Sequence, residues 1–296
     1  MAFKKYMHIE RFGNDEVQGI EIGECYVFPK VDGTNGSVWG DDDGIHTGSR
    51  RRELSIAQDN AGFHHFVLGN DALKNMAELN KNLRFFGEWL VPHSLKTYRD
   101  DAWRRFYIFD VFNDGTDEYL SYPEYSEICK KFGVDFIPPL CIMRNATYDN
   151  LLVELGNNFF LVRDGEGCGE GIVIKNYRFQ NQFGRTVWAK IITNRFKEKH
   201  SREQPTVKKM AGIVEQKICD EYITLHLAQK VYAKIANEMG GWNNKYIPRL
   251  LQTVFYDFVN EEIWSVVKNL KHPTINFKTL YSMAILRVKE LLPEIF

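Results

Sequence analysis

The chain has 296 residues, of which 44% are hydrophobic, and its formal net charge at pH 7 is −1. This length reaches the size at which a single hydrophobic core usually stops growing, so two domains are expected. The sequence lacks an apolar run long enough for a signal peptide or a membrane span, and its five cysteines lack the CxxC spacing of a zinc site. We therefore expect a cytoplasmic protein with free thiols and no disulfide framework.

The first informative segment is KVDGTNG, residues 30–36. Residues 25–31 have the alternation of a strand, and Gly33 and Gly36 allow a tight turn with close backbone approach to a ligand. Lys30 would then lie at a strand end that faces a pocket. Deprotonating a lysine at neutral pH costs roughly 4 kcal/mol, so a nucleophilic lysine needs help from its surroundings. The alternative is a surface hairpin in which the DG pair merely makes the turn.

Three guanidiniums follow within residues 48–53, where they can grip phosphate oxygens or form an ordinary solvated face. Residues 84–91 form an apolar strand interrupted by Glu88, and a carboxylate in such a strand is costly to bury unless it has a partner. Residues 105–112 repeat this pattern with an aromatic that can stack on a base and with one acid, Asp110. The alternative for the third segment is a core strand in which the acid caps a neighbouring group.

Two more segments have the same character. Residues 166–175 place a glycine-rich bend and the carboxylate of Glu170 directly before a β-branched strand. Residues 186–191 predict another strand, which contains one lysine that can point inward, Lys190. A charged residue at a strand edge would give the same pattern, so neither segment is diagnostic alone.

Taken in this order, the segments resemble the nucleotidyltransferase motifs of the covalent superfamily that contains ATP-dependent DNA ligases, RNA ligases and mRNA capping enzymes. The resemblance covers about residues 20–195. It implies an α+β nucleotidyltransferase domain with ATP-grasp-like antiparallel sheets and flanking helices. It also implies that Lys30 is the nucleophile of motif I and that Glu88 is the ribose-binding acid of motif III. Phe109 and Asp110 would be the aromatic and the acid of motif IIIa. Arg50, Glu170 and Lys190 would be the ligands of motifs Ia, IV and V, in that order.

Within the superfamily, the chain is most similar to the phage-type RNA ligase 2 enzymes. Asn35 lies five residues after the lysine, as in the KxxGTN form of motif I, and Arg50 follows at the family's spacing. We expect both residues, together with Asp110, to bind the RNA substrate. Some RNA ligases carry another residue at the position of Asp32. An aspartate there is similar to the motif of DNA ligases and capping enzymes. Trp188 replaces the first lysine of the motif V KxK, which leaves phosphate neutralisation to the other cations of the site and to metal.

The resemblance implies a three-step reaction. The Lys30 amine attacks the α-phosphate of ATP, pyrophosphate leaves, and a lysyl-AMP forms; the AMP then passes to an RNA 5′-phosphate and is displaced by a 3′-hydroxyl. The acids Glu88, Asp32 and Glu170 favour the ammonium form of the lysine, because opposite charge stabilises it. A divalent cation, Mg²⁺ or Mn²⁺, is therefore expected on Glu170, while Lys190 stabilises charge on the phosphate.

Glycine usage predicts the domain boundary, because 19 of the 22 glycines precede residue 201. We expect an adenylyltransferase domain over residues 1–200 and a small all-α domain over residues 201–296 that binds nucleic-acid ends. The second part has 13 Lys+Arg against 10 Asp+Glu. Apolar residues at helical spacing run from Val214 to Leu225, from Leu251 to Phe258 and from Phe277 to Leu292, and are separated by Gly240-Gly241 and His272-Pro273.

This helical tail is the main reason to prefer RNA, since DNA ligases and capping enzymes usually append a β-barrel after motif V. Residues 195–202, together with Arg99, Arg104 and Arg105, are expected to contact phosphates, or else to form a solvated linker. The leading hypothesis is a monomeric ATP-dependent RNA ligase that acts in RNA repair without a membrane. A DNA ligase or guanylyltransferase explains the motifs but not the tail. A non-catalytic RNA-binding protein would form no covalent adduct.

Overall fold

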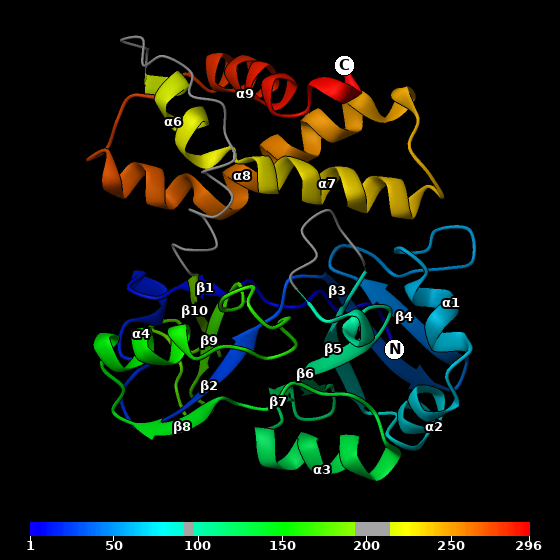
Figure 1. Ribbon diagram of the computed structural model, residues 1–296. Helices are drawn as coiled ribbons and strands as arrows, with labels where there is room; N and C mark the ends of the chain where they lie inside the picture. Colours follow the sequence, from blue (N-terminus) through cyan, green and yellow to red (C-terminus); the bar gives the residue numbers. More distant parts are fainter. Residues whose placement is uncertain (92–97, 193–213) are drawn as a thin grey trace. The chain divides into compact units, whose positions relative to one another are not determined.

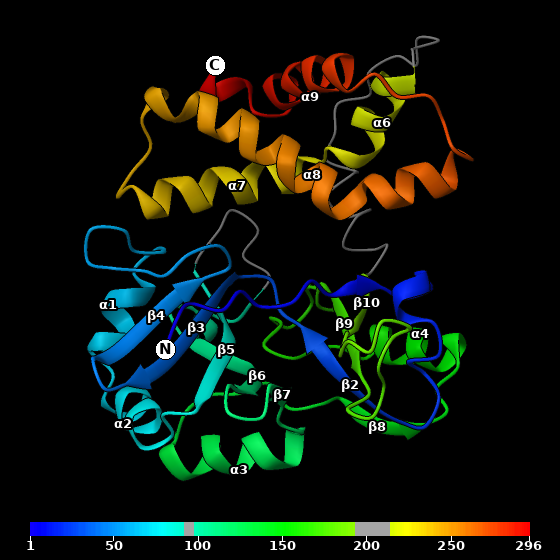
Figure 2. The same cartoon turned by 180° about the vertical axis from the view of Figure 1, so that it is seen from behind.

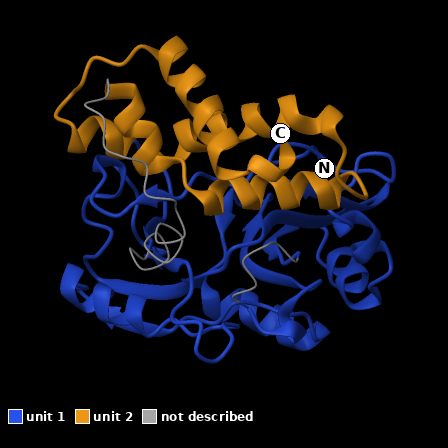
Figure 3. Cartoon of the chain, turned by 45° about the horizontal axis from the view of Figure 1, so that its top comes forward, with its two compact units in different colours: residues 1–92, 97–193 blue, residues 93–96, 194–296 orange. Residues whose placement is uncertain are grey.

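The computed structural model describes residues 1–91, 98–192 and 214–296, which form two compact units. Unit 1 comprises residues 1–92 and 97–193, and unit 2 comprises residues 93–96 and 194–296 (Figure 3). Unit 1 contains all the strands of the described chain, and the described part of unit 2 is helical. The predicted α+β class, with antiparallel-rich sheets and a helical C-terminal part, is confirmed. The boundary expected at residue 200 lies outside the described residues.

Unit 1 contains two five-stranded sheets, which we call sheet A and sheet B (Figure 1). All neighbouring strands of sheet A are antiparallel except the pair β1·β10. From edge to edge, sheet A consists of β1 (Glu10–Arg11), β10 (Ala189–Ile192), β9 (Gly171–Lys175), β2 (Glu24–Lys30) and β8 (Cys141–Arg144). The short helix α4 (Tyr148–Gly156) follows β8 and packs against β9.

Sheet B is antiparallel throughout. Its strands, from edge to edge, are β4 (Gly44–Ser49), β3 (Thr34–Asp41), β5 (Leu83–Trp89), β6 (Phe106–Asn113) and β7 (Glu118–Tyr119). It is flanked by the helices α1 (Phe63–Leu68), α2 (Asp71–Leu79) and α3 (Tyr122–Phe132). Helix α3 begins with a capping box, in which Glu124 accepts a hydrogen bond from the Ser121 backbone at 2.7 Å. Short 3₁₀ turns complete the unit at Asp15–Val17 and Asp100–Ala102.

The prediction that Gly36 belongs to a turn was wrong. The connection between β2 and β3 spans residues 31–33, with a bend at Gly33, and Gly36 lies inside β3. A Cβ atom at Gly36 would lie 2.7 Å from the Phe63 ring, and one at its cross-strand partner Gly87 would lie 2.6 Å from the Phe106 ring. Both glycines therefore make room for aromatic rings beneath sheet B, which is a common reason for glycine inside a strand.

One hydrophobic cluster joins the two sheets. It contains Phe28 and Trp188 from the sheet A side together with Phe86 and Tyr107 from sheet B. The opposite face of sheet B packs on α1, α2 and α3, and the opposite face of sheet A packs on α4. The N-terminal segment crosses from the region of β4 to β1 over both sheets (Figure 2). The shared cluster includes residues of β2, β5 and β9, the strands that carry or adjoin the predicted site residues Lys30, Glu88 and Glu170.

Unit 2 contains four helices among its described residues: α6 (Val214–Tyr222), α7 (Leu225–Glu238), α8 (Ile247–Asn269) and α9 (Phe277–Leu291), with 3₁₀ turns at Asn244–Tyr246 and Pro293–Ile295. They enclose a hydrophobic core of their own. The helical pattern predicted from Val214 through Leu225 is interrupted, because Thr224 caps α7 by accepting a hydrogen bond from Leu227 N at 3.2 Å. None of the described helices has the length and hydropathy needed to span a bilayer.

Candidate active site

Lys30 is the last residue of β2, at the strand end predicted from the sequence. Its Nζ lies 2.6 Å from Oε2 of Glu170. The contact follows from the strand register, because Lys30 pairs with Gly171, the residue after Glu170. A Cβ atom at Gly171 would lie 2.3 Å from the carbonyl oxygen of Ile191, so only glycine fits without a shift of the backbone. The two predicted catalytic residues are thus brought together by a glycine-dependent strand pair.

The segment that follows the lysine is held by one buried and one partly buried hydrogen bond. The Asp32 backbone N–H donates to the Tyr98 hydroxyl at 2.7 Å, and the Gly33 N–H donates to Glu88 Oε1 at 2.9 Å. A Cβ atom at Gly33 would lie 2.6 Å from the Trp89 carbonyl oxygen, which requires glycine here as well. The predicted motif III acid therefore contacts the backbone of the motif I turn directly.

Asn35 and Glu88 share one face of sheet B. They are cross-strand partners in the β3·β5 pair, and directly paired residues project from the same side of a sheet. The neighbouring pair, Gly36 and Gly87, faces the other side, where aromatic rings cover it. Glu88 is partly exposed, so its face is accessible to a ligand.

Two further lysines lie on the face of sheet A that carries Lys30. Lys190 pairs with Val173, which pairs with Phe28, two residues before Lys30. Lys175 is two residues after Val173 on the same strand, so it projects from the same face. Lys190 is 7% exposed and Lys175 is 2% exposed. Two of the three lysines on this face have a carboxylate partner, since Lys30 contacts Glu170 and Lys175 contacts Asp110.

Asp110 is fully buried at the centre of a side-chain cluster. Its carboxylate accepts hydrogen bonds from Lys175 Nζ at 2.7 Å, from Trp188 Nε1 at 3.1 Å and from the Tyr6 hydroxyl. Lys175 Nζ also donates to the Phe109 carbonyl oxygen at 2.6 Å. The cluster therefore links β6 of sheet B to β9 of sheet A and holds the backbone of the residue predicted to stack on adenine.

Burial determines the protonation of several groups in and near this cluster. It lowers the pKa of Lys175, an effect that the ion pair with Asp110 opposes. It raises the pKa of Tyr6 well above the usual range, with a further contribution from the Asp110 charge. Burial and the nearby Asp32 also raise the pKa of Tyr98. The two phenols consequently stay protonated at neutral pH.

Direct contact between Asp110 and RNA, as expected from the sequence, would require this cluster to open, because the carboxylate is 0% exposed. Lys175, Tyr6 and Tyr98 received no role from the sequence. For Lys175 a signal was available, since it is a charged residue at the end of the apolar strand Gly171–Lys175. That is the same signal that marked the acid in residues 84–91.

The predicted phosphate-binding arginines lie outside this cluster. Arg50 is exposed in the segment after β4, with Nη2 3.3 Å from Nδ1 of His8. Arg105 forms a bidentate ion pair with Asp135 at 2.7 and 2.8 Å, and Arg99 pairs with a neighbouring aspartate at 3.1 Å. Arg104 is exposed. The basic segment predicted over residues 195–202 lies outside the described residues.

The candidate site can hold a divalent cation through one carboxylate, provided that phosphate oxygens and waters supply the other ligands. In the described ranges of the chain, no group of three or more His, Cys, Asp or Glu side chains is arranged to hold a metal ion. Mg²⁺ is commonly held by one or two carboxylates, with substrate phosphates and waters completing its shell. Glu170, which lies beside Lys30, supplies one such carboxylate. The site therefore suits a cation that arrives with a nucleotide.

The solved structures that this chain resembles include those of an RNA ligase of Naegleria gruberi. The ligase with PPi is 25% identical, and the match covers 68% of this chain and 59% of that one, with a TM-score of 0.54. A substituted form of the same ligase with ATP and Mn is 25% identical, with coverage of 67% and 58% and a TM-score of 0.51. This chain thus spans less than two thirds of the length of these proteins.

No curated protein sequence matches the chain, whereas a protein-family profile does. The family profile described as RNA ligase matches residues 23–192, a range that begins just before β2 and ends with β10. This range contains Lys30, Glu88, Glu170 and Lys190. With more than half of its length matched by this profile, the chain belongs to the RNA ligase family.

Proposed function

We propose that this chain is an ATP-dependent RNA ligase, which joins 3′-hydroxyl and 5′-phosphate RNA ends through a lysyl-AMP on Lys30. The observation that carries the proposal is the Lys30–Glu170 contact of 2.6 Å at the end of β2, within the range matched by the RNA ligase profile. ATP and a divalent cation come to this proposal from the related ligase solved with ATP and Mn.

In the first step, Lys30 loses its ammonium proton to solvent and the neutral amine attacks the α-phosphate of ATP. The N–P bond forms as the P–O bond to the leaving pyrophosphate breaks. Glu170 holds the side chain of Lys30 at the strand end, and Glu88 fixes the turn that follows it and binds the ribose. Lys190 stabilises negative charge on the phosphate from the same face of sheet A. A divalent cation on Glu170, when bound, neutralises phosphate charge. Phe109 stacks on the adenine, with its backbone held from below by a buried lysine.

In the later steps the protein mainly aligns the reacting ends. Arg50 and Asn35 bind the 5′-phosphate end, and Lys30 releases the AMP onto it. Asp110 acts at a distance, by fixing the strand that carries the adenine-stacking residue. The helical residues of unit 2 bind the RNA ends. Membership of the RNA ligase 2 type, a monomeric state and a cytoplasmic location all stay predictions.

The test is covalent labelling. The protein, a Lys30→Ala variant and a Lys81→Ala control are incubated with α-labelled ATP or GTP and Mg²⁺, and then denatured and separated by electrophoresis. We expect an acid-labile, alkali-stable AMP adduct on the wild type and the control, and none on the Lys30 variant. Lys81 is a suitable control because it is an exposed lysine paired with Asp42.

Each alternative gives a different outcome. An AMP adduct followed by sealing of nicked DNA in preference to RNA would identify a DNA ligase. A GMP adduct would identify a capping-type guanylyltransferase. No adduct with either nucleotide would overturn the proposal and favour a non-catalytic RNA-binding protein.

A further inference from the structure

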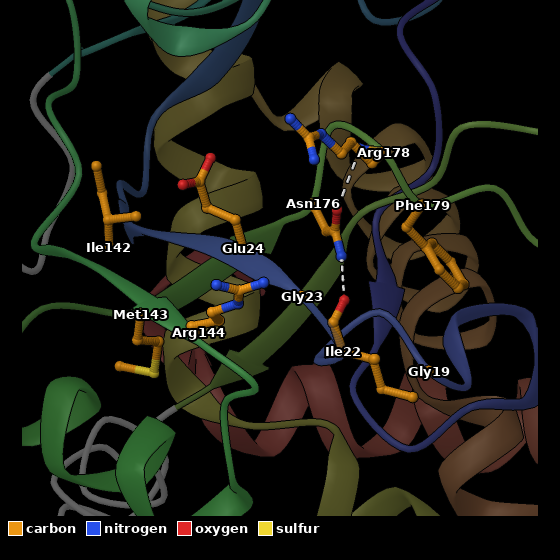
Figure 4. Close-up of a pocket in the computed structure, with 10 residues that line it drawn as sticks. All are labelled: Gly19, Ile22, Gly23, Glu24, Ile142, Met143, Arg144, Asn176, Arg178 and Phe179. Atoms are coloured by element: carbon orange, nitrogen blue, oxygen red, sulfur yellow. Dashed lines mark hydrogen bonds between the residues drawn. The ribbon is translucent and has the colours of Figure 1, made fainter.

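A surface pocket of about 760 Å³ lies on unit 1, at the opposite end of β2 from the nucleophile (Figure 4). Glu24, the first residue of β2, contributes to its wall, whereas Lys30 is the last residue of that strand. At about 3.3 Å per residue, the two ends of this strand are separated by roughly 20 Å. The pocket is therefore separate from the candidate active site, although both lie in the same unit.

The walls of the pocket are held in place by hydrogen bonds. The buried Asn176 side chain donates from Nδ2 to the carbonyl oxygens of Ile20 at 3.1 Å and Ile22 at 2.7 Å, and its Oδ1 accepts from the Arg178 N–H at 3.1 Å. On the other side, the Gly23 N–H donates to the Asn145 side chain at 2.8 Å. Three segments far apart in the sequence are thus tied into one preformed rim.

Two guanidiniums dominate the chemistry of the pocket. Arg144, on the edge strand β8, extends toward the middle of the pocket, and Arg178, in the loop after β9, lies at its rim (Figure 4). Both residues are exposed, and in the part of the chain that the structure describes neither side chain takes part in a hydrogen bond or ion pair. Arginines in such a place are suited to the oxygens of an anionic ligand, which they can bind in a fork.

The remaining wall narrows the class of anion. The Phe179 ring and two exposed isoleucines, Ile22 at 67% and Ile142 at 52%, supply apolar surface against which a flat ring can pack. Glu24 supplies one carboxylate, and its backbone lies opposite that of Arg144 in the β2·β8 register. A carboxylate accepts hydrogen bonds from hydroxyl and amino groups, so the pocket offers partners for phosphate, for a base and for a ribose hydroxyl together.

We propose that this pocket binds a nucleotide of single-stranded RNA, several nucleotides away from the end that is joined. The volume suits one nucleotide unit, and the exposed rim lets the strand continue on either side. Aromatic surface combined with arginines is the usual platform for single strands. The assignment rests on the proposed function and deepens it, because it gives the ligase a second contact with its RNA.

Binding of RNA tests this assignment. The probe is a fluorescein-labelled single-stranded RNA of about 12 nucleotides, a length within the usual range for single-strand sites. Its affinity is measured by anisotropy at low and moderate salt for the wild type and for the Arg144→Ala/Arg178→Ala variant. The matched control is Lys74→Ala/Lys81→Ala, which also removes two positive charges from unit 1 but from exposed ion pairs near α2.

We expect the arginine variant to bind about tenfold more weakly at low salt, with a salt slope smaller by about 1.4, since each lost phosphate contact on a single strand reduces it by about 0.7. The control should stay within about twofold of the wild type. An Arg144→Lys/Arg178→Lys variant should keep most of the salt slope, which separates lost charge from lost folding. All variants should form the AMP adduct as the wild type does.

Other results would overturn the assignment. Equal loss in the control would indicate a general charge effect, and unchanged RNA affinity of the arginine variant would exclude a contact. Displacement of the RNA by AMP or UMP at equal concentration would identify a free-nucleotide site, and displacement by polyglutamate would identify a site for an acidic protein. Absence of an AMP adduct on the wild type would contradict the proposed function. The RNA affinities of the variants would still test whether the pocket binds RNA.

Discussion

At the scale of single residues, the candidate site was predicted from polar side chains within or beside apolar strands. Glu88 and Lys190 were selected because a charge in a buried strand needs a partner, and Glu170 because it directly precedes such a strand. Their partners could not be identified in the same way. Lys175 meets Asp110 across 65 positions of sequence, and Tyr98 meets Asp32 across 66. Such pairs depend on how distant strands align, which a local pattern does not specify.

The buried pair of Asp110 and Lys175 gives a prediction at this scale. Each single substitution, Asp110→Asn or Lys175→Met, leaves a buried charge or polar group without its partner and should lower the free energy of unfolding by about 3–5 kcal/mol. The double variant should lose less than the sum of the two, because neither charge remains. Urea unfolding of the four proteins measures this coupling. Strictly additive losses would show that the two side chains do not depend on each other.

At the scale of elements, the strands that carry the site were predictable, but some of their boundaries were not. Residues 186–191 predicted a strand that in fact begins at Ala189. Gly36 was expected in a turn because glycine is common there, yet it lies in β3 beneath an aromatic ring. The sequence does not distinguish a glycine required by a turn from one required by close packing. At Gly36 the packed aromatic ring, which only the structure shows, identifies the second case.

The β9 glycine gives a prediction at this scale. Gly171→Ala should displace β9 from β10, because the added methyl group would lie 2.3 Å from the Ile191 carbonyl oxygen. We expect a loss of about 1–3 kcal/mol in the free energy of unfolding. Since Glu170 would move with the strand, labelling with ATP should fall at least about tenfold, a change of about 1.4 kcal/mol in the barrier.

A control for this variant is Gly156→Ala, at the end of α4, where no atom lies within 4 Å of the added methyl group. It should label normally. Thermal melting and adduct formation are measured on both variants. A Gly171→Ala protein with wild-type labelling would show that the β9·β10 pairing does not position Glu170.

At the scale of the whole molecule, the described residues form two units, each with its own core. Three hydrophobic clusters lie in unit 1 and one in unit 2. The shift from a glycine-rich to a helical pattern near residue 200 was visible in the sequence, because periodicity reports secondary structure locally. Which strands would form two separate sheets was not visible, since that depends on pairings such as β2·β9 between segments more than 140 positions apart.

The separate cores give the final prediction. Residues 1–193 expressed alone should fold and should form the AMP adduct on Lys30, because the residues proposed for the first step all lie in unit 1. Joining of RNA ends should be lost or reduced by more than about tenfold, which corresponds to about 1.4 kcal/mol. Circular dichroism, adduct labelling and RNA sealing check this. A folded fragment that seals RNA as the full chain does would remove the role proposed for unit 2.

The contact between Lys30 and Glu170 has a consequence for chemical selectivity. A neutral amine in an accessible site reacts with many small electrophiles, such as aldehydes, acyl phosphates and carbon dioxide, whereas an ammonium group has no lone pair to offer. An adjacent carboxylate at 2.6 Å favours the ammonium form. Under the proposed function, the carboxylate of Glu170 would mask the lysine in this way until a nucleotide binds, and would so protect it from adventitious modification.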